Sequence, residues 1–508
     1  MSTVAEMQVN REVISKKFNE IMEFTQSAAT NGSAVHEIEQ GLWEHVLALG
    51  GQMMQVFFSS LGDGDEGEEV RMPDGRVLKR FVDLHTRPYL SIFGNFELQR
   101  TVYGTRERQK IEYVPLDARL QLPKGKFSYV LQEWNHSFAL EMPFAQVSSL
   151  LERMLGFKQS VNSLERSNRW CAEDIEDFWE DVSVPVAKEE GELLVCSADG
   201  KGVPMRRNAE PKQDKPIELT SGMRPGDKKM GLVGAVYTVD RYARTPEQIV
   251  DALFRTGEKP MDDVGRPKPC FKHVRAALKR DFAGTTEPQV KEIFGWIAQE
   301  AEQRGRSEQK QHLVLLMDGQ LSLWDAGYDY LPVEKFEVVE ILDLLHAAAY
   351  VWKAVHLFYP SNSLKAAKLA RKQLSLLVSG KLEQMIRSFL GKANRDRLSK
   401  QKRSDLRKII GYFRGNAERM QYADFLAAGY PIASGIIEGA CRTVVKDRME
   451  RAGMRWVFDG AHAMMGLRSI HLSALWNDFL AYRIGKEQRR LYPGNSANDD
   501  LPPLFLAA

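Results

Sequence analysis

Apolar residues recur along the chain with two different spacings, which predict where helices and strands lie. Apolar residues three or four positions apart run through residues 8–60 and again through 127–182, which is helical spacing. Between these regions, residues 71–115 alternate apolar and polar residues and contain turn residues, which is typical of a small β-rich module. The first part of the chain therefore predicts helices, then strands, then helices.

The middle of the chain contains short apolar runs that end on acidic residues. Residues 192–198 form such a run before Asp199, and residues 312–317 form another before Asp318. Glycines at 200 and 202 predict a tight turn after the first run. Further strands are expected at 203–206, 229–239 and 336–341, and helices at 246–254, 271–281 and 288–303. This mixture predicts an α/β sheet with both aspartates near its open edge, where ligand sites commonly lie.

From residue 344 to about 430 the pattern is helical and strongly basic. The whole chain has a formal net charge of only +2, but residues 365–419 hold 16 Lys or Arg and 4 Asp or Glu, a local charge of +12. A solvated helical face is one explanation, although an excess of this size favours a surface that meets phosphates. The candidate phosphate contacts are Lys400, Lys402, Arg403, Arg407 and Lys408.

Residues 127–185 contain a candidate DNA-reading element. One helix is expected to end near Gly156, and a second to start after a Ser160 cap. Two helices joined by a tight turn suit a helix-turn-helix, whose second helix can enter a major groove. The alternative is an ordinary helical hairpin with solvated polar residues. The reading face would comprise Asn162, Ser163, Arg166 and Arg169.

Composition disfavours several other classes of protein. The four cysteines lie far apart and form no CxxC pair, so buried reduced thiols are expected rather than zinc or a disulfide framework. No apolar run reaches about 18 residues, and the first residues lack the apolar core of a signal peptide, so no membrane association is expected. No Gly-rich phosphate loop occurs, so a nucleotide cofactor is not expected.

Four segments resemble the motifs of DDE insertion-sequence transposases of the ISKra type. They are CSADGKGVPM (196–205), LLMDGQ (315–320), DLLHAAAYVW (343–352) and PIASGIIEGACRTVVKDRMERAGMRW (431–456). The resemblance covers roughly residues 130–480 and implies an RNase H-like catalytic core. In such a core Asp199, Asp318 and Glu438 would bind two Mg²⁺ (or Mn²⁺). The 120 residues from Asp318 to Glu438 then imply a helical insertion, which coincides with the basic region.

The resemblance implies a bacterial enzyme that cuts and rejoins double-stranded DNA, namely element ends and target DNA. Two Mg²⁺ about 3.5–4 Å apart can activate the nucleophile and stabilise the leaving oxygen, and carboxylates are their preferred ligands. A homo-oligomer, at least a dimer, is expected in the cytoplasm at the bacterial nucleoid, because two ends must be joined. One alternative is an RNase H-like nuclease without strand transfer. Another is a non-catalytic DNA-binding descendant, which the presence of all three carboxylates disfavours.

Other residues near the motifs have candidate roles. Glu438 is preferred over neighbouring acids because apolar residues precede it and small residues follow it, which suits a carboxylate facing a buried site. Asp343 and His346 would position the DNA end or hydrogen-bond the metal ligands, although Asp343 could simply cap a helix. Phosphate contacts or ordinary surface charges are expected at Lys201, Arg442 and Lys446.

These observations predict a multidomain α/β protein whose RNase H-like mixed-sheet core is interrupted by an all-helical insertion. Helical, small β and helix-turn-helix modules precede the core. The predicted boundaries are an N-terminal helical region at 1–62, a β-rich module at 71–120, a helix-turn-helix region at 127–185, the first part of the core at 190–345, the basic insertion at 346–430, the second part of the core at 431–484, and a tail at 485–508.

Overall fold

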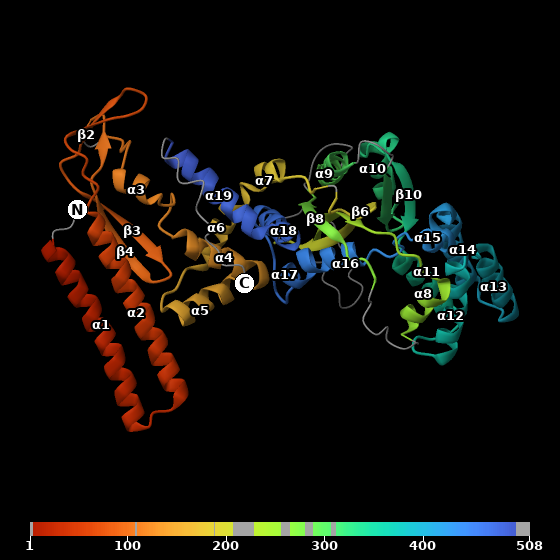
Figure 1. The fold of residues 1–508 in the computed structure, drawn as a ribbon. Coiled ribbons are helices and arrows are strands. Elements are labelled where there is room, and N and C mark those ends of the chain that lie inside the picture. Colours follow the sequence, from red (N-terminus) through yellow and green to blue (C-terminus); the bar gives the residue numbers. More distant parts are fainter. Residues whose placement is uncertain are drawn as a thin grey trace, which may run out of the picture. The chain divides into compact units, whose positions relative to one another are not determined.

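The computed structural model divides into two compact units, of which the first is built from both ends of the chain. One unit comprises Met1–Phe178 with Asn477–Ala508, and the other comprises Trp179–Trp476 (Figure 1). The structure describes residues 4–106, 109–186, 188–206, 228–255, 265–279, 288–305 and 311–493. Within these residues no helix is long and apolar enough to cross a membrane.

The first unit follows the predicted order of helices, strands and helices. Its small strands form a three-stranded sheet of order β1-β2-β5 and a β3-β4 hairpin. Phe58 packs against Phe96 and Leu98 of the hairpin, which fixes α2 on these strands. The elements are α1 (Val4–Asn31), α2 (Val35–Leu61), β1 (Glu69–Arg71), β2 (Val77–Arg80), β3 (His85–Ser91), β4 (Gly94–Arg100), β5 (Tyr103–Gly104), α3 (Pro115–Leu120), α4 (Tyr129–Glu141), α5 (Phe144–Leu155), α6 (Val161–Ala172) and α7 (Ile175–Asp181).

The C-terminal helix α19 (Trp476–Leu491) contributes buried contacts to the first unit. The Arg483 guanidinium lies 4.0 Å from the centre of the Trp170 ring, and Lys486 forms an ion pair with Asp174. Helix α19 runs to Leu491, across the predicted boundary between the second part of the core at 431–484 and the tail. From Asn477 onward it belongs with the N-terminal residues rather than with the sheet. Residues 494–508 of the predicted tail lie outside the described residues.

The second unit contains the predicted mixed sheet, with strand order β10-β9-β6-β7-β8. Strand β7 is antiparallel to both β6 and β8, whereas β9 is parallel to β6 and β10 is parallel to β9. The strands are β6 (Leu193–Pro204), β7 (Lys228–Val239), β8 (Cys270–Leu278), β9 (His312–Met317) and β10 (Glu337–Leu342). Strands β7, β9 and β10 confirm the predicted runs to within one residue at each end.

The prediction of a helix over residues 271–281 is wrong, because β8 occupies Cys270–Leu278. The segment contains alanine, lysine and arginine, which favour helix in isolation. Strand β8 instead pairs with β7 from Gly231–Leu278 to Thr238–Cys270, and this pairing overrides the local preference.

The predicted turn at Gly200–Gly202 does not form, and β6 continues without interruption to Pro204. Gly200 pairs with Leu232 and Gly202 pairs with Met230, so both glycines stay in the antiparallel ladder with β7. A second strand at 203–206 therefore does not exist separately. Asp199 consequently lies within a long strand rather than at its end.

Helices cover both faces of the sheet, and two glycines of β7 let them approach closely. A Cβ atom at Gly231 would lie 2.7 Å from Met465 of α18 (Phe458–Leu472), and one at Gly234 would lie 2.7 Å from Ile293 of α9 (Pro288–Arg304). Residues 231 and 234 face opposite sides of a strand because side chains alternate. Helices α18 and α9 therefore pack on opposite faces.

The basic helical region shares one hydrophobic core with the sheet. Leu374, Phe389 and Phe413 of these helices belong to the same buried cluster as Val195, Val314 and Leu316 of the strands. The predicted insertion is therefore packed as part of the second unit. The remaining helices of this unit are α8 (Pro246–Phe254), α10 (Leu321–Tyr330), α11 (Leu344–His356), α12 (Leu364–Val378), α13 (Leu382–Arg395), α14 (Lys400–Gly415), α15 (Tyr422–Ala427), α16 (Gly435–Cys441) and α17 (Asp447–Met449), with a π-helix over Arg442–Lys446 between the last two.

Candidate active site

Asp199 lies within β6, while Asp318 and Asp343 directly follow β9 and β10 of the same sheet. The parallel pairing of β6 with β9 ends at Cys196 and Leu315, and Asp199 and Asp318 are close enough for the charge of Asp318 to raise the pKa of Asp199. Met317 of β9 pairs with Leu342 of β10, so Asp318 and Asp343 directly follow paired residues. The structure thus brings together acidic residues that are far apart in the sequence.

Glu438 reaches the same region from helix α16, which packs against β6 and β7. The Cys441 thiol, one turn after Glu438, donates a weak hydrogen bond to the Asp199 carbonyl at 3.7 Å. The expectation that Glu438 faces a buried site is wrong, because its side chain is exposed. Ile437 and Ala440 take the buried face of α16, so Glu438 lies on the open side.

The charges of these acids act on one another. Burial, and then the charge of Asp318, raise the pKa of the Asp199 carboxyl, while Lys201 is among the groups that oppose this shift. Partial desolvation, and then the charges of Asp343 and Asp199, raise the pKa of Glu438; His346 and Lys201 lower it. The site therefore concentrates negative charge that the protein itself does not fully compensate, a setting that favours a bound cation.

Asp318 is fixed by contacts on both its side chain and its backbone. Its Oδ1 accepts a hydrogen bond from the Gln320 N–H at 2.8 Å, and its carbonyl accepts one from the Trp324 indole at 2.9 Å. Trp324 is almost fully buried, so this hydrogen bond ties the end of β9 to the core.

Asp343, which directly follows β10, connects the sheet to the segment that leads into α16. It is buried and caps α11, since Oδ1 accepts from the Leu345 N–H at 3.0 Å. The same oxygen accepts from the Ser434 N–H at 3.1 Å, and Oδ2 accepts from the Ser434 hydroxyl at 2.7 Å. The interpretation of Asp343 as a helix cap is confirmed. Its other described bonds go to Ser434, at the start of the helix that carries Glu438, and not to Asp199, Asp318 or Glu438 themselves.

Tyr412 of α14 is a site residue that the sequence analysis missed. Its hydroxyl is buried, has no hydrogen-bond partner among the described residues, and lies against Gly319, where any side chain would collide with it. Burial, followed by Tyr350, Asp318 and Asp343, raises the pKa of Tyr412. Its ring stacks on Tyr350 with centroids 3.8 Å apart. No local pattern marks Tyr412, because the fold alone brings the basic helices to the sheet edge.

His346 and the predicted cations differ in how closely they approach the acids. The His346 ring lies 5.6 Å from that of Tyr350, and its charge influences Glu438. Lys201 is half-buried in β6 and influences both Asp199 and Glu438. Arg442 is exposed and pairs with Asp447 at 3.3 Å, and Lys446 is exposed at the end of the same π-helix.

The predicted helix pair in the first unit is confirmed. Helix α5 ends at Gly156, whose φ is +74°, and the Ser160 hydroxyl caps α6 by accepting from the Ser163 N–H. Gln159 anchors the connection, because its carbonyl accepts from Ser148 and its side chain accepts from Asn135. Exposed positions on α6 are Asn162, Arg166 and Arg169, whereas the Ser163 hydroxyl is half-buried and accepts from Gln159 at 3.3 Å.

The predicted phosphate contacts of the basic region lie exposed on α14. Two of them also support the fold: Lys402 donates to the Leu357 carbonyl at 2.8 Å, and Arg403 donates to the Leu398 carbonyl at 2.9 Å. Lys408 lies 3.8 Å from Asp405, which is a weak surface ion pair.

The donor atoms of the site suit a hard divalent cation. The four acids contribute carboxylate oxygens, which Mg²⁺ and Mn²⁺ prefer. Among the described residues, no three Asp, Glu, His or Cys side chains are arranged closely enough to coordinate one metal ion. The four cysteines are free; Cys171, Cys196 and Cys441 are buried, and Cys270 is partly exposed.

Comparison with known proteins yields no identification. No protein-family model matches the chain, and no curated protein matches it.

Proposed function

We propose that this chain is a DDE transposase of an insertion sequence, of the ISKra type that its motifs resemble. The observation that carries the proposal is the approach of three acids: Asp199 in β6, Asp318 directly after the neighbouring parallel strand β9, and Glu438 on α16 raise one another's pKa through their charges, Asp318 that of Asp199 and Asp199 that of Glu438. A mixed sheet with β9 and β10 parallel to β6, and β7 antiparallel to it, is compatible with an RNase H-like core.

The acids would divide the work of holding two divalent metal ions. The charge of Asp318 raises the pKa of Asp199, and the charge of Asp199 raises the pKa of Glu438. Asp199 would therefore contact both ions, while Asp318 and Glu438 would each contact one of them. When bound, such a metal pair supplies an activated nucleophile and stabilises the leaving oxygen in phosphodiester cleavage. Asp343 and Trp324 keep the ligand-bearing segments in place, and Lys201 would contact a phosphate oxygen.

The reaction proposed for this site has two phosphoryl transfers. In the first, water attacks the phosphorus at the element end, the bond to the 3′-oxygen breaks, and a free 3′-hydroxyl remains. In the second, that hydroxyl attacks a phosphodiester of the target, and the displaced oxygen leaves on the target strand. The exposed cations of α14 and α6 would hold the DNA backbone and the element end, and a dimer or larger oligomer would pair the two ends.

The test is cleavage and joining by the full chain on duplex DNA that carries the inverted repeats flanking the gene. Asp199→Asn, Asp318→Asn and Glu438→Gln should retain folding and DNA binding but lose both cleavage and joining. The matched control is Asp424→Asn, because Asp424 is an exposed acid on α15 and should be dispensable.

Metal removal provides the second arm of this test. Excess EDTA should abolish both reactions, and Mg²⁺ should raise the melting temperature of the wild type more than that of Glu438→Gln. Full activity in EDTA, or near wild-type activity of Glu438→Gln, would contradict the proposal. Cleavage without joining would indicate an RNase H-like nuclease instead.

A further inference from the structure

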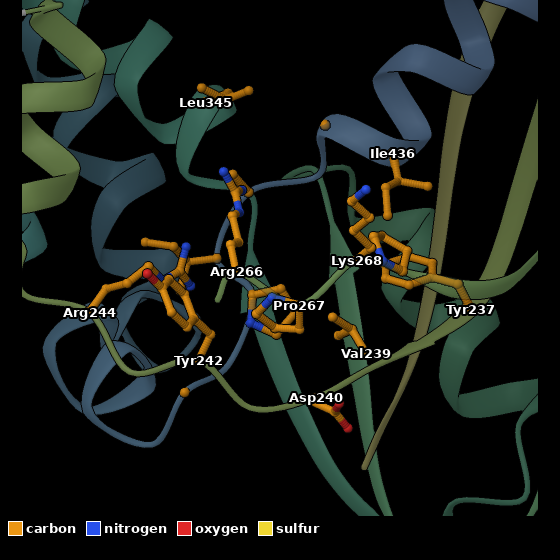
Figure 2. A pocket seen from close by; sticks show the side chains of 16 residues that line it. Tyr237, Val239, Asp240, Tyr242, Arg244, Arg266, Pro267, Lys268, Leu345 and Ile436 are labelled. Atoms are coloured by element: carbon orange, nitrogen blue, oxygen red, sulfur yellow. The ribbon is translucent and has the colours of Figure 1, made fainter. Parts of the chain in front are cut away.

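A cavity of about 490 Å³ lies in the second unit beside the segment that leads into α16. It is lined by the end of β7, by residues 266–269 and by several residues from Gly429 to Ile436 (Figure 2). Its volume falls in the range of about 300–1,000 Å³ that is usual for sites that enclose a small ligand. None of the four site acids lines it.

Three cationic side chains line this cavity: Arg244, Arg266 and Lys268 (Figure 2). Burial, and then the charge of Arg266, lower the pKa of Arg244. Arg244 donates one hydrogen bond to the Tyr430 carbonyl at 2.7 Å, but its buried Nε has no acceptor among the described residues. Arginine and lysine side chains that line one cavity favour an anionic ligand, because each can donate charge-assisted hydrogen bonds to it.

Asp240 is the one acidic side chain among the described residues that line the cavity. Asp240 accepts a hydrogen bond from the Glu192 N–H at 3.1 Å. In Figure 2 it lies at the end of the cavity away from Leu345 and Arg266.

Flat and apolar side chains complete the lining. Tyr237 is buried, Tyr242 is half-buried, and Pro267 and Ile436 add apolar surface. A planar base can stack on an aromatic ring, while cations beside the ring bind its phosphate. The combination suits a nucleotide better than an inorganic anion, which would leave the apolar part of the cavity unfilled.

The cavity adjoins the candidate active site through shared residues. Ala433 and Gly435 line it and flank Ser434, whose N–H and hydroxyl bind Asp343. Leu345 lines it as well and precedes His346. A strand that passes the carboxylates could therefore place a neighbouring nucleotide here.

We propose that this cavity, which we call the α16 pocket, binds one unpaired nucleotide of a DNA strand next to the phosphate that is cut. Arg244, Arg266 and Lys268 contact its phosphate, and Tyr242 stacks on its base. The inference rests on the proposed function and adds a site for single-stranded DNA to it.

The test compares two DNAs with the same end-bearing duplex, one blunt and one with a short unpaired thymidine overhang at the cleavage position. Fluorescence anisotropy of the full chain in EDTA measures binding without cleavage. The wild type should bind the overhang DNA about tenfold more tightly, in keeping with about 1–3 kcal/mol for one stacked base. Arg266→Gln/Lys268→Gln should reduce this preference to below about twofold. These two exposed residues are chosen because Arg244 also supports the Tyr430 backbone.

Matched variants separate pocket effects from general charge effects. Lys291→Gln removes an exposed cation of α9 and should leave the overhang preference unchanged. Tyr242→Phe should keep the preference, whereas Tyr242→Ala should lose it. With 5-iodouracil in the overhang, ultraviolet light should crosslink the DNA to a peptide that contains Tyr242.

The outcomes distinguish this inference from the proposed function. If the wild type cleaves end DNA but binds both DNAs equally, or if Arg266→Gln/Lys268→Gln keeps the preference, the α16 pocket does not bind an unpaired nucleotide. If free thymidine monophosphate crosslinks to the pocket while the overhang gives no preference, the ligand is a free nucleotide and the inference is overturned. If the wild type neither binds nor cuts any end DNA, the proposed function itself fails.

Discussion

The hydrogen bonds between Asp343 and Ser434 predict that two residues 91 positions apart are energetically coupled. Asp343→Ala removes an α11 cap, which costs about 0.5–2 kcal/mol. It also removes two charged hydrogen bonds to Ser434, each contributing about 1.5–3 kcal/mol to stability. Because these contributions are not fully additive, we expect a total loss of about 3–5 kcal/mol. Ser434→Ala removes only the hydroxyl bond and should cost about 1.5–3 kcal/mol.

A double-mutant cycle measures this coupling directly. The shared bond between the Ser434 hydroxyl and Oδ2 is lost in both single variants, so the double variant should be less destabilised than their sum by about 1.5–3 kcal/mol. Hydrogen exchange of the Ser434 and Leu345 amides reports the local free energy of opening without requiring two-state unfolding of the whole chain.

The same hydrogen bonds should matter for function, because Ser434 immediately precedes the helix that carries Glu438. In Ser434→Ala the Mg²⁺ concentration for half-maximal cleavage should rise about tenfold, as is usual when a group that orients a metal ligand is lost. Cleavage at saturating Mg²⁺ should fall much less, and Ser434→Thr, which keeps the hydroxyl, should behave like the wild type. Additive single variants, or an unchanged Mg²⁺ requirement, would show that Asp343 is only a helix cap.

Three further predictions concern other parts of the chain. Replacing Lys400, Arg407 and Lys408 by Gln removes three exposed cations whose side chains donate to no backbone carbonyl among the described residues. This change should weaken binding to all DNA sequences alike and reduce the salt slope of binding by about 3, whereas an unchanged slope would identify a merely solvated face. Tyr412→Phe removes a buried hydroxyl without a partner and should stabilise the protein by about 1 kcal/mol in urea unfolding, yet slow cleavage about tenfold, and unchanged cleavage would remove this hydroxyl from the site. Burial, and then Arg483, lower the pKa of His136 to about 3, so the unfolded state binds more protons between about pH 6.5 and pH 3. The free energy of unfolding should therefore have its full value above about pH 6.5 and fall as the pH drops through this window. Urea unfolding at several pH values should show a weaker dependence of this free energy on pH in His136→Phe. The same pH dependence in both proteins would exclude His136 as its source.

Local patterns predicted most of the elements that carry the site. Strands β7 and β9 follow from continuous apolar runs, and the helix predicted over 246–254 is α8. Strand β8 could not be predicted in the same way, because its helix-favouring composition is overridden by pairing with β7.

In the candidate site, too, the residues that follow local sequence patterns could be predicted, whereas the contacts between distant segments could not. Asp199 and Asp318 are recognisable because buried runs lead into them. Asp343 bonds to Ser434, and Tyr412 approaches Gly319, because segments far apart in the sequence pack together. The local sequence around these residues contains no pattern that predicts either contact. Whether Glu438 is exposed depends on which face of α16 packs against the sheet. Helix α16 has only seven residues, too few for its sequence pattern to identify that face.

The order in which the chain leaves the ribosome bears on the first unit. The second unit is continuous from Trp179 to Trp476, so every residue that it needs has been synthesised before α19 appears. The helix pair α5–α6 belongs to a unit whose last buried contacts, those of Arg483 and Glu487, come from the final helix. A chain truncated before α19 would therefore contain every residue of the mixed sheet, whereas α5 and α6 would belong to a unit that lacks the buried contacts of Arg483 and Glu487.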